Sequence, residues 1–137
     1  MDIRLNKELQ NKLDIFVSSK GKKLSDFKKI CDIDEFTYSK QEIDAIQDLY
    51  TQSINEDNLS IKEYIYIYIG EALIHNAGGE WSIGKLKKDE AYGQPIILHY
   101  GNPEKDHIRI FPEAWLYRLE NGTIRTSISQ LIEICKE

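Results

Sequence analysis

Three histidines, two cysteines and a run of acidic residues are the side chains of this sequence that could do chemistry. A zinc site needs Cys or His ligands grouped at short, characteristic spacings, and His75, His99 and His107 do not show such a spacing. His99 and His107 could meet across a hairpin, near Glu104 and Asp106. We expect histidines that flank a surface turn there, and we predict no metal and no cofactor.

Nucleophilic catalysis finds no support in the motifs of the sequence. There is no Gly-x-Ser-x-Gly turn, and neither Cys31 nor Cys135 has the glycine-rich or basic surroundings that lower a thiol pKa. Such widely separated cysteines are typical of buried thiols in a reducing compartment, and a disulfide between them is the alternative. Gly78-Gly79 fits no phosphate-binding glycine motif. We therefore assign no catalytic residue and expect a protein that is not an enzyme.

Acidic side chains are concentrated between residues 32 and 57, where eight of them accompany one lysine. Asp32-Ile33-Asp34 begins like a calcium loop, but the glycine and the further oxygen ligands of such a loop do not follow. The simpler interpretation is a solvated acidic surface, and the functional one is an interface for a basic protein. The candidate interface residues are Asp32, Asp34, Glu35, Glu42, Asp44 and Asp48.

The charge distribution also argues against other partners. The formal net charge is −5, and residues 31–137 carry nineteen acidic and ten basic side chains. Nucleic-acid binding needs basic surface that displaces counterions, so we expect no nucleic-acid partner. No stretch approaches the roughly 20 apolar residues that span a bilayer, and charges interrupt the first sixteen residues throughout. We expect a cytoplasmic protein that binds no membrane.

The length of 137 residues and the 41% hydrophobic content predict one α+β domain over residues 1–137. In its first half, apolar residues at helical spacing predict an amphipathic helix over 4–18, ended by Gly21. A shorter helix over 24–31 and a third over 39–52 should follow. The first helix also offers a surface for a homodimer.

The segment 61–76 has features of both a strand and a helix. Tyr64 to Ile69 alternates aromatic and β-branched residues, as strands do. Ser60 and Glu63 form a capping-box pattern, good helix formers follow, and Gly78-Gly79 can end a helix. We predict a helix, which must be central and buried because it is apolar nearly all round.

Eight tyrosines are more than a chain of this size usually carries. Tyrosine is favoured at protein interfaces because its ring is large, stiff and amphipathic. Tyr64, Tyr66 and Tyr68 cannot all point one way on a helix, so at least one should project away from the main core. That side chain either marks a contact surface or is covered by a second layer of helices.

The residues after Gly79 favour strands and then helices. Alternating and apolar stretches predict a three-stranded antiparallel meander across 80–111, with a loop at 85–94 and a turn at 101–106. Two C-terminal helices should follow. Pro112 suits the first position of one, with Asn121-Gly122 as its stop, and Ser127 caps the other.

The meander suggests an alternative function, that of a small enzyme or ligand-binding domain with a pocket between the sheet and the helices. Strand alternation places His107 and Arg109 on one face, opposite Ile108 and Ile110. The candidate pocket residues are His99, Tyr100, His107 and Arg109.

Four short motifs carry a resemblance to a known group of proteins. They are Tyr68–Leu73, Gly78–Trp81, Phe111-Pro112 and Arg118–Gly122. Over residues 64–135 this pattern resembles small uncharacterised bacterial domains found among polymorphic-toxin immunity proteins. The resemblance implies a fold in which the glycines turn the chain and the tryptophan fills the core, and it supplies no catalytic residues. With the acidic segment and the tyrosines, it leads us to expect a non-catalytic protein-binding module, an immunity protein that neutralises a basic toxin domain by direct binding.

Overall fold

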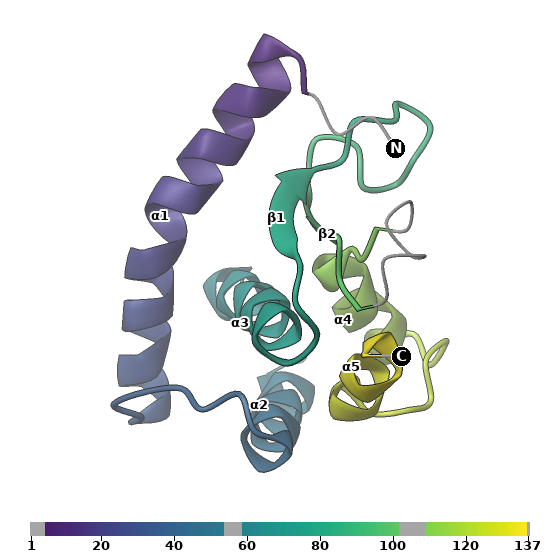
Figure 1. Ribbon diagram of the computed structural model, residues 1–137. Helices are drawn as coiled ribbons and strands as arrows, with labels where there is room; N and C mark the ends of the chain where they lie inside the picture. Colours follow the sequence, from purple (N-terminus) through teal and green to yellow (C-terminus); the bar gives the residue numbers. More distant parts are fainter. Residues whose placement is uncertain (1–4, 54–58, 102–108, 137) are drawn as a thin grey trace.

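The computed structural model describes residues 5–53, 59–101 and 109–136. Within these ranges the fold is α+β, as predicted, with five helices and one two-stranded antiparallel sheet. Figure 1 shows the long first helix along one side of the molecule, with the other elements grouped beside it. In chain order the elements are α1 (Lys7–Cys31), α2 (Lys40–Ser53), α3 (Leu59–Ala77), β1 (Glu80–Ile83), β2 (Pro95–Leu98), α4 (Pro112–Glu120) and α5 (Ile128–Cys135).

Helix α3 forms the centre of the core because apolar side chains occur on all of its faces. It packs against all four other helices and against β2. Ile65, Ile67, Tyr68 and Leu73 are fully buried. The prediction of a central buried helix, rather than a strand, is confirmed. Neither α3 nor another helix in the described ranges has the length and apolar character needed to cross a membrane.

The N-terminal segment is one helix, so the prediction of two helices, over 4–18 and 24–31, is wrong. α1 runs without a break through Gly21, where one glycine costs a helix only about 1 kcal/mol. Packing of a continuous inward-facing row of side chains stabilises the single helix by more than this cost. Its positions, 9, 13, 16, 20, 24, 27 and 31, are buried or half-buried and recur every three or four residues. The helix ends where Asp32 adopts a left-handed conformation with φ 56°.

Helices α1 and α5 each begin at a side-chain cap. Asn6 accepts a hydrogen bond from the backbone N–H of Leu9 at 2.8 Å and so caps α1. Ser127, the predicted cap of α5, accepts one from the N–H of Gln130 at 3.2 Å. Ser60, predicted to cap the central helix, lies instead within the bounds of α3, which begins one residue earlier.

The sheet has two strands, so the predicted three-stranded meander is wrong. β1 and β2 pair antiparallel along their full lengths. Ile110 makes only an isolated bridge to Ile97, through two backbone hydrogen bonds of 2.9 and 3.0 Å. Pairing does not extend further because Pro112, whose φ is fixed for a helix, starts α4 two residues later. Residues 102–108, with most of the predicted turn, lie outside the described residues.

The indole of Trp81 connects β1 to both α3 and α1. Its ring lies so close to Gly70 that a Cβ on this residue would overlap it. Its Nε1 donates to Glu71 at 3.0 Å, and Glu71 also pairs with Lys20 of α1 at 2.9 Å. The ring of Phe16 lies 4.7 Å from that of Trp81, centroid to centroid. Two of the motifs singled out in the sequence therefore meet in one contact.

The two cysteines carry thiols and form no disulfide with each other. Cys31 is half-buried, and Cys135 is buried in the core. Burial raises the pKa of the Cys31 thiol, and the nearby Glu42 raises it further. A raised pKa disfavours the thiolate, which is the reactive form of cysteine.

Substitution of two helical glycines by alanine should change the free energy of unfolding in opposite directions. Gly70→Ala should lower the free energy of unfolding by about 1–3 kcal/mol, because the new methyl group would displace the Trp81 ring. Gly21→Ala should raise it by about 0.5–1 kcal/mol, because a Cβ at this position meets no atom within 4 Å. Urea unfolding followed by circular dichroism measures both. Equal effects of the two substitutions would contradict the described packing of Trp81.

Candidate functional site

The six acidic residues predicted to bind a partner fall into two groups in the structure. Asp32, Asp34, Glu35 and Asp48 are exposed. Glu35 lies 3.3 Å from the Nζ of Lys28. The carboxylates of Asp32, Asp34 and Asp48 make neither a hydrogen bond nor an ion pair with another described residue. Glu42 and Asp44 instead hold parts of the fold together.

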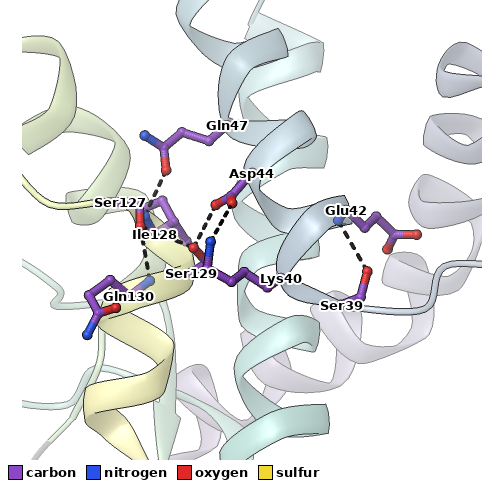
Figure 2. Close-up of polar contacts among 9 residues, drawn as sticks. All are labelled: Ser39, Lys40, Glu42, Asp44, Gln47, Ser127, Ile128, Ser129 and Gln130. Carbon is purple, nitrogen blue, oxygen red and sulfur yellow. Dashed lines mark hydrogen bonds and ion pairs between the residues drawn. The ribbon is translucent and has the colours of Figure 1, made fainter.

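Glu42 fixes the start of α2 and the connection that precedes it. Its carboxylate accepts hydrogen bonds from the N–H groups of Thr37 and Tyr38, at 3.1 and 3.0 Å, and from the hydroxyl of Tyr68 at 2.7 Å. In return Ser39 accepts from the N–H of Glu42 at 3.2 Å (Figure 2). The Ser-x-x-Glu pattern of a capping box was visible in the sequence and was missed, although Glu42 bonds to the N–H groups of the two residues before Ser39 and not to that of Ser39 itself. Partial burial acts to raise the pKa of Glu42, but these hydrogen bonds outweigh it and lower the pKa overall.

Asp44 and Gln47 join α2 to the first turn of α5, as Figure 2 shows. Asp44 accepts a hydrogen bond of 2.6 Å from the buried hydroxyl of Ser129 and lies 3.1 Å from the Nζ of Lys40. Gln47 accepts one of 2.7 Å from the N–H of Ile128, a donor that a helix cannot satisfy within its first turn. The bond from Ser129 lowers the pKa of Asp44, burial opposes this, and Lys40 adds to the lowering. Asp44 therefore stabilises the contact between the two helices.

The second predicted set consists of His99, Tyr100, His107 and Arg109, expected to line a pocket beside the sheet. His107 lies outside the described residues. Tyr100 is buried in the core, and burial raises its pKa to about 12. The Nδ1 of His99 lies 3.1 Å from the carboxylate of Glu80. The three described members thus have separate structural contacts and do not gather around one cavity.

Arg109 holds the loop that connects the two strands. Its guanidinium donates hydrogen bonds of 2.6 and 3.0 Å to the two carboxylate oxygens of Asp89, a bidentate arrangement. These bonds lower the pKa of Asp89, against the opposing effect of burial. A hollow beside Arg109 has a volume of about 30 Å³, little more than the space for a water molecule. Neither His99 nor Tyr100 lines it.

An open cleft between α3 and α4, with a volume of about 390 Å³, is larger than this hollow. That volume is typical of pockets that hold small ligands or side chains. We call it the Tyr–Glu cleft, after the residues that dominate its walls, Tyr50, Glu63, Tyr66, Glu113, Tyr117 and Glu120. Among the described residues that line it, Lys62 is the only basic one.

Helical spacing directs the aromatic side chains of α3 to different sides. Two residues advance about 200° around an α-helix, so Tyr66 lies opposite Tyr64 and Tyr68. Tyr64 packs near Phe27, with ring centroids 6.0 Å apart, and Tyr68 is fully buried. Tyr66 is half-buried and lines the cleft. Tyr66 therefore lies on the other side of α3 from Tyr64 and Tyr68, but like Tyr64 it still packs against the main core.

Two of the three glutamates in the cleft are compensated by neighbouring groups. Tyr50 donates a hydrogen bond to Glu120, and the Nζ of Lys62 lies 3.0 Å from the same carboxylate. The bond from Tyr50 lowers the pKa of Glu120, burial opposes this, and Lys62 adds to the lowering. Glu63 lies 2.9 Å from the Nζ of Lys23, on α1.

Glu113 differs from the other two glutamates because it makes no hydrogen bond or ion pair with another described residue. Its residue surface is largely exposed, yet the protein around the carboxyl group raises its pKa, and the charge of Glu63 raises it further. The same two carboxylates, together with burial, raise the pKa of Tyr66, so its hydroxyl stays protonated. The cleft therefore carries an uncompensated negative charge beside aromatic rings.

The ionisable groups in the cleft are carboxylates, phenols and one ammonium group. Among the described residues that line it there is no thiol, imidazole or aliphatic hydroxyl, whereas Glu63, Glu113 and Glu120 are carboxylates, which bind cations and can also act as acids or bases. Across the described ranges, no three His, Cys, Asp or Glu side chains are grouped in a way that could hold a metal ion. Carboxylates and tyrosine rings together are suited to contacts with a cation.

Comparison with known proteins identifies no relative. No protein-family model matches the chain, and no curated protein or solved structure is similar enough to count as a match. The resemblance to immunity proteins therefore stays a prediction from sequence. In this chain the residues that carry it, among them Gly70, Glu71 and Trp81, have a structural role.

Single substitutions of two aspartates on α2 should show which carboxylate stabilises the fold and which does not. Asp44→Ala should lower the free energy of unfolding by about 1–2 kcal/mol, because the buried hydroxyl of Ser129 loses its acceptor. Asp48→Ala should change it by less than about 0.5 kcal/mol, as for most surface substitutions. Chemical denaturation of the two variants measures the difference. If Asp44→Ala were as harmless as Asp48→Ala, the contact between α2 and α5 would not depend on this carboxylate.

The pairing of Asp89 with Arg109 should make stability depend on pH in the acid range. The folded pKa of Asp89 is lowered, so its contribution is complete above its unfolded pKa of about 4 and is lost as the pH falls through the folded value. The free energy of unfolding should therefore decrease below about pH 4. Asp89→Asn should reduce stability by about 1–2 kcal/mol at pH 7 and flatten this decrease.

Urea titrations from pH 7 to pH 3 would provide the measurement. Asp34→Asn is the control, because Asp34 is exposed and has no described partner. This control should keep the pH dependence of the original protein. An unchanged slope in Asp89→Asn would show that the ion pair adds nothing to acid sensitivity.

Proposed function

We propose that this protein is a non-catalytic protein-binding module of the bacterial cytoplasm, an immunity protein that neutralises a toxin by binding it directly. The toxin domain that it binds has a basic surface. The observation that carries the proposal is the exposure of Asp32, Asp34 and Asp48, whose carboxylates form no ion pair with another described residue, although Lys28 and Lys29 line the same hollow as Asp32 and Asp34.

Such carboxylates contribute little to the stability of the fold. Exposed charges interact weakly with their own protein because water screens them. Facing a basic surface, the same charges increase the rate of association and disfavour acidic partners. A role in recognition therefore explains their position better than a role in folding.

The fold also holds these carboxylates in place. Asp32 ends α1 in a left-handed conformation, and its N–H donates to the carbonyls of Lys28 and Lys29. At the other end of the connection, Glu42 accepts hydrogen bonds from two successive backbone N–H groups. A surface segment anchored at both ends loses less conformational entropy on binding, which favours affinity. In the proposal Glu42 thus positions the interface and does not itself contact the partner.

Reversal of two exposed charges should weaken capture of the partner. We expect the double variant Asp34→Lys, Asp48→Lys to fold normally and to bind its partner at least about tenfold more weakly, because attraction becomes repulsion. The original protein and the variant serve as baits in the source cells, and quantitative mass spectrometry identifies what each retains. The original protein should retain one stoichiometric partner with a basic domain, and co-expression should protect cells from that partner.

Glu8→Lys, Glu133→Lys is the matched control, because it makes the same change in net charge at exposed positions on α1 and α5. The control bait should retain the partner like the original protein. Two results would overturn the proposal: recovery of the bait alone, or a partner retained equally by all three baits.

A further inference from the structure

We infer that the Tyr–Glu cleft receives an arginine side chain of the protein partner. The inference rests on the proposed function for the source of this side chain. The cleft and its charge are features of this chain alone, so they can be tested without the partner.

One of the three carboxylates in the cleft has no compensating cation among the described residues. Glu120 is compensated by Lys62 and Glu63 by Lys23, whereas Glu113 has no compensating group among the described residues. Glu113 follows the first residue of α4, where the helix dipole favours a negative charge, yet its pKa is raised. Partial burial raises this pKa most, and the charge of Glu63 raises it further. A cation bound between Glu63 and Glu113 would remove this unfavourable interaction.

The aromatic rings in the cleft favour a guanidinium group over other cations. Tyr66 and Tyr117 line the cleft from facing helices, and Tyr117 is 65% exposed, although large aromatic rings are usually covered. A guanidinium group stacks on such rings and at the same time donates hydrogen bonds to carboxylates in its plane. The compact, strongly hydrated ammonium of lysine loses more on leaving water. A divalent metal would need clustered ligands, which the described residues do not form.

The shape of the cleft suits a side chain that enters from outside. It is open to solvent, and its volume of about 390 Å³ leaves room for an extended arginine. Glu113 and Tyr117 lie at i and i+4 on the exposed side of α4. An arginine at the tip of a loop on the partner would meet these requirements.

Capped tripeptides provide a probe that does not require the partner. Acetyl-Gly-Arg-Gly-amide is titrated into the ¹⁵N-labelled protein, with the citrulline peptide as its neutral isostere and the lysine peptide as the alternative cation. We expect saturable shifts of the amide signals of Tyr66, Glu113 and Tyr117, with a dissociation constant in the millimolar range. The citrulline peptide should bind at least about tenfold more weakly, and the lysine peptide several-fold more weakly.

Two substitutions on α4 test the assigned residues. Glu113→Gln should weaken arginine binding about tenfold, since it removes the uncompensated charge, and Tyr117→Ala should weaken it several-fold. Both residues are exposed, so the variants should fold like the original protein. Glu133→Gln, an exposed charge on α5, is the matched control and should bind like the original protein.

The inference is overturned if the arginine peptide gives no saturable shifts in the cleft, if citrulline binds equally well, or if Glu113→Gln has no effect. The capture experiment separates this failure from that of the proposed function. If a partner is captured but the arginine peptide does not bind the cleft, only the cleft assignment is overturned. If the arginine peptide binds the cleft but no partner is captured, the cleft assignment stands and the proposed function is overturned. Once a partner is known, equal binding to Glu113→Gln would show that its arginine does not enter the cleft.

Discussion

Burial of α3 on all sides is the constraint on which the rest of this structure depends. A helix with isoleucine and tyrosine around its whole circumference cannot lie on a surface, since each such side chain left in water forgoes about 1.5–3 kcal/mol. All four other helices and β2 supply the cover. The close approach of β1 requires a glycine at position 70, against which the Trp81 ring lies. Between α3 and α4, Tyr66 remains partly exposed and lines the Tyr–Glu cleft.

Carboxylates join the covering elements to one another and to α3. Glu71 links α3 to α1 and β1, Glu42 links α2 to α3, and Asp44 links α2 to α5. Each accepts hydrogen bonds from groups that would otherwise lose their partners on burial, which is costly. These three carboxylates therefore have a structural role. The acids left for recognition are the exposed ones and those in the cleft.

How much the sequence predicts depends on the range of the interactions that decide each feature. α2, α3, α4 and α5 follow from local signals, namely helical spacing, Pro112 and the cap at Ser127. The single helix α1 was missed because Gly21 was given more weight than an apolar face that continues past it. The local bonds of Glu42 at the start of α2 follow a Ser-x-x-Glu spacing that was missed. The role of Asp44 depends on Ser129, 85 residues away in the chain, and the bond from Tyr68 to Glu42 spans 26 residues, and no spacing rule shows such partners. The Tyr–Glu cleft combines residues of α2, α3 and α4, and for the same reason it could not be predicted from the sequence.

The two acidic features suit different stages of the proposed binding. Carboxylates such as Asp34 and Asp48 act on a partner at a distance, over the Debye length of about 8 Å at physiological salt, and so influence mainly the rate of association. Glu113 and Glu63 line the cleft together with aromatic rings, so their contacts with a bound group are short-ranged. An arginine held there would act mainly on the rate of dissociation. Because the two sets of charges lie on different elements, a partner would have to match both, and this requirement would give the interaction its specificity.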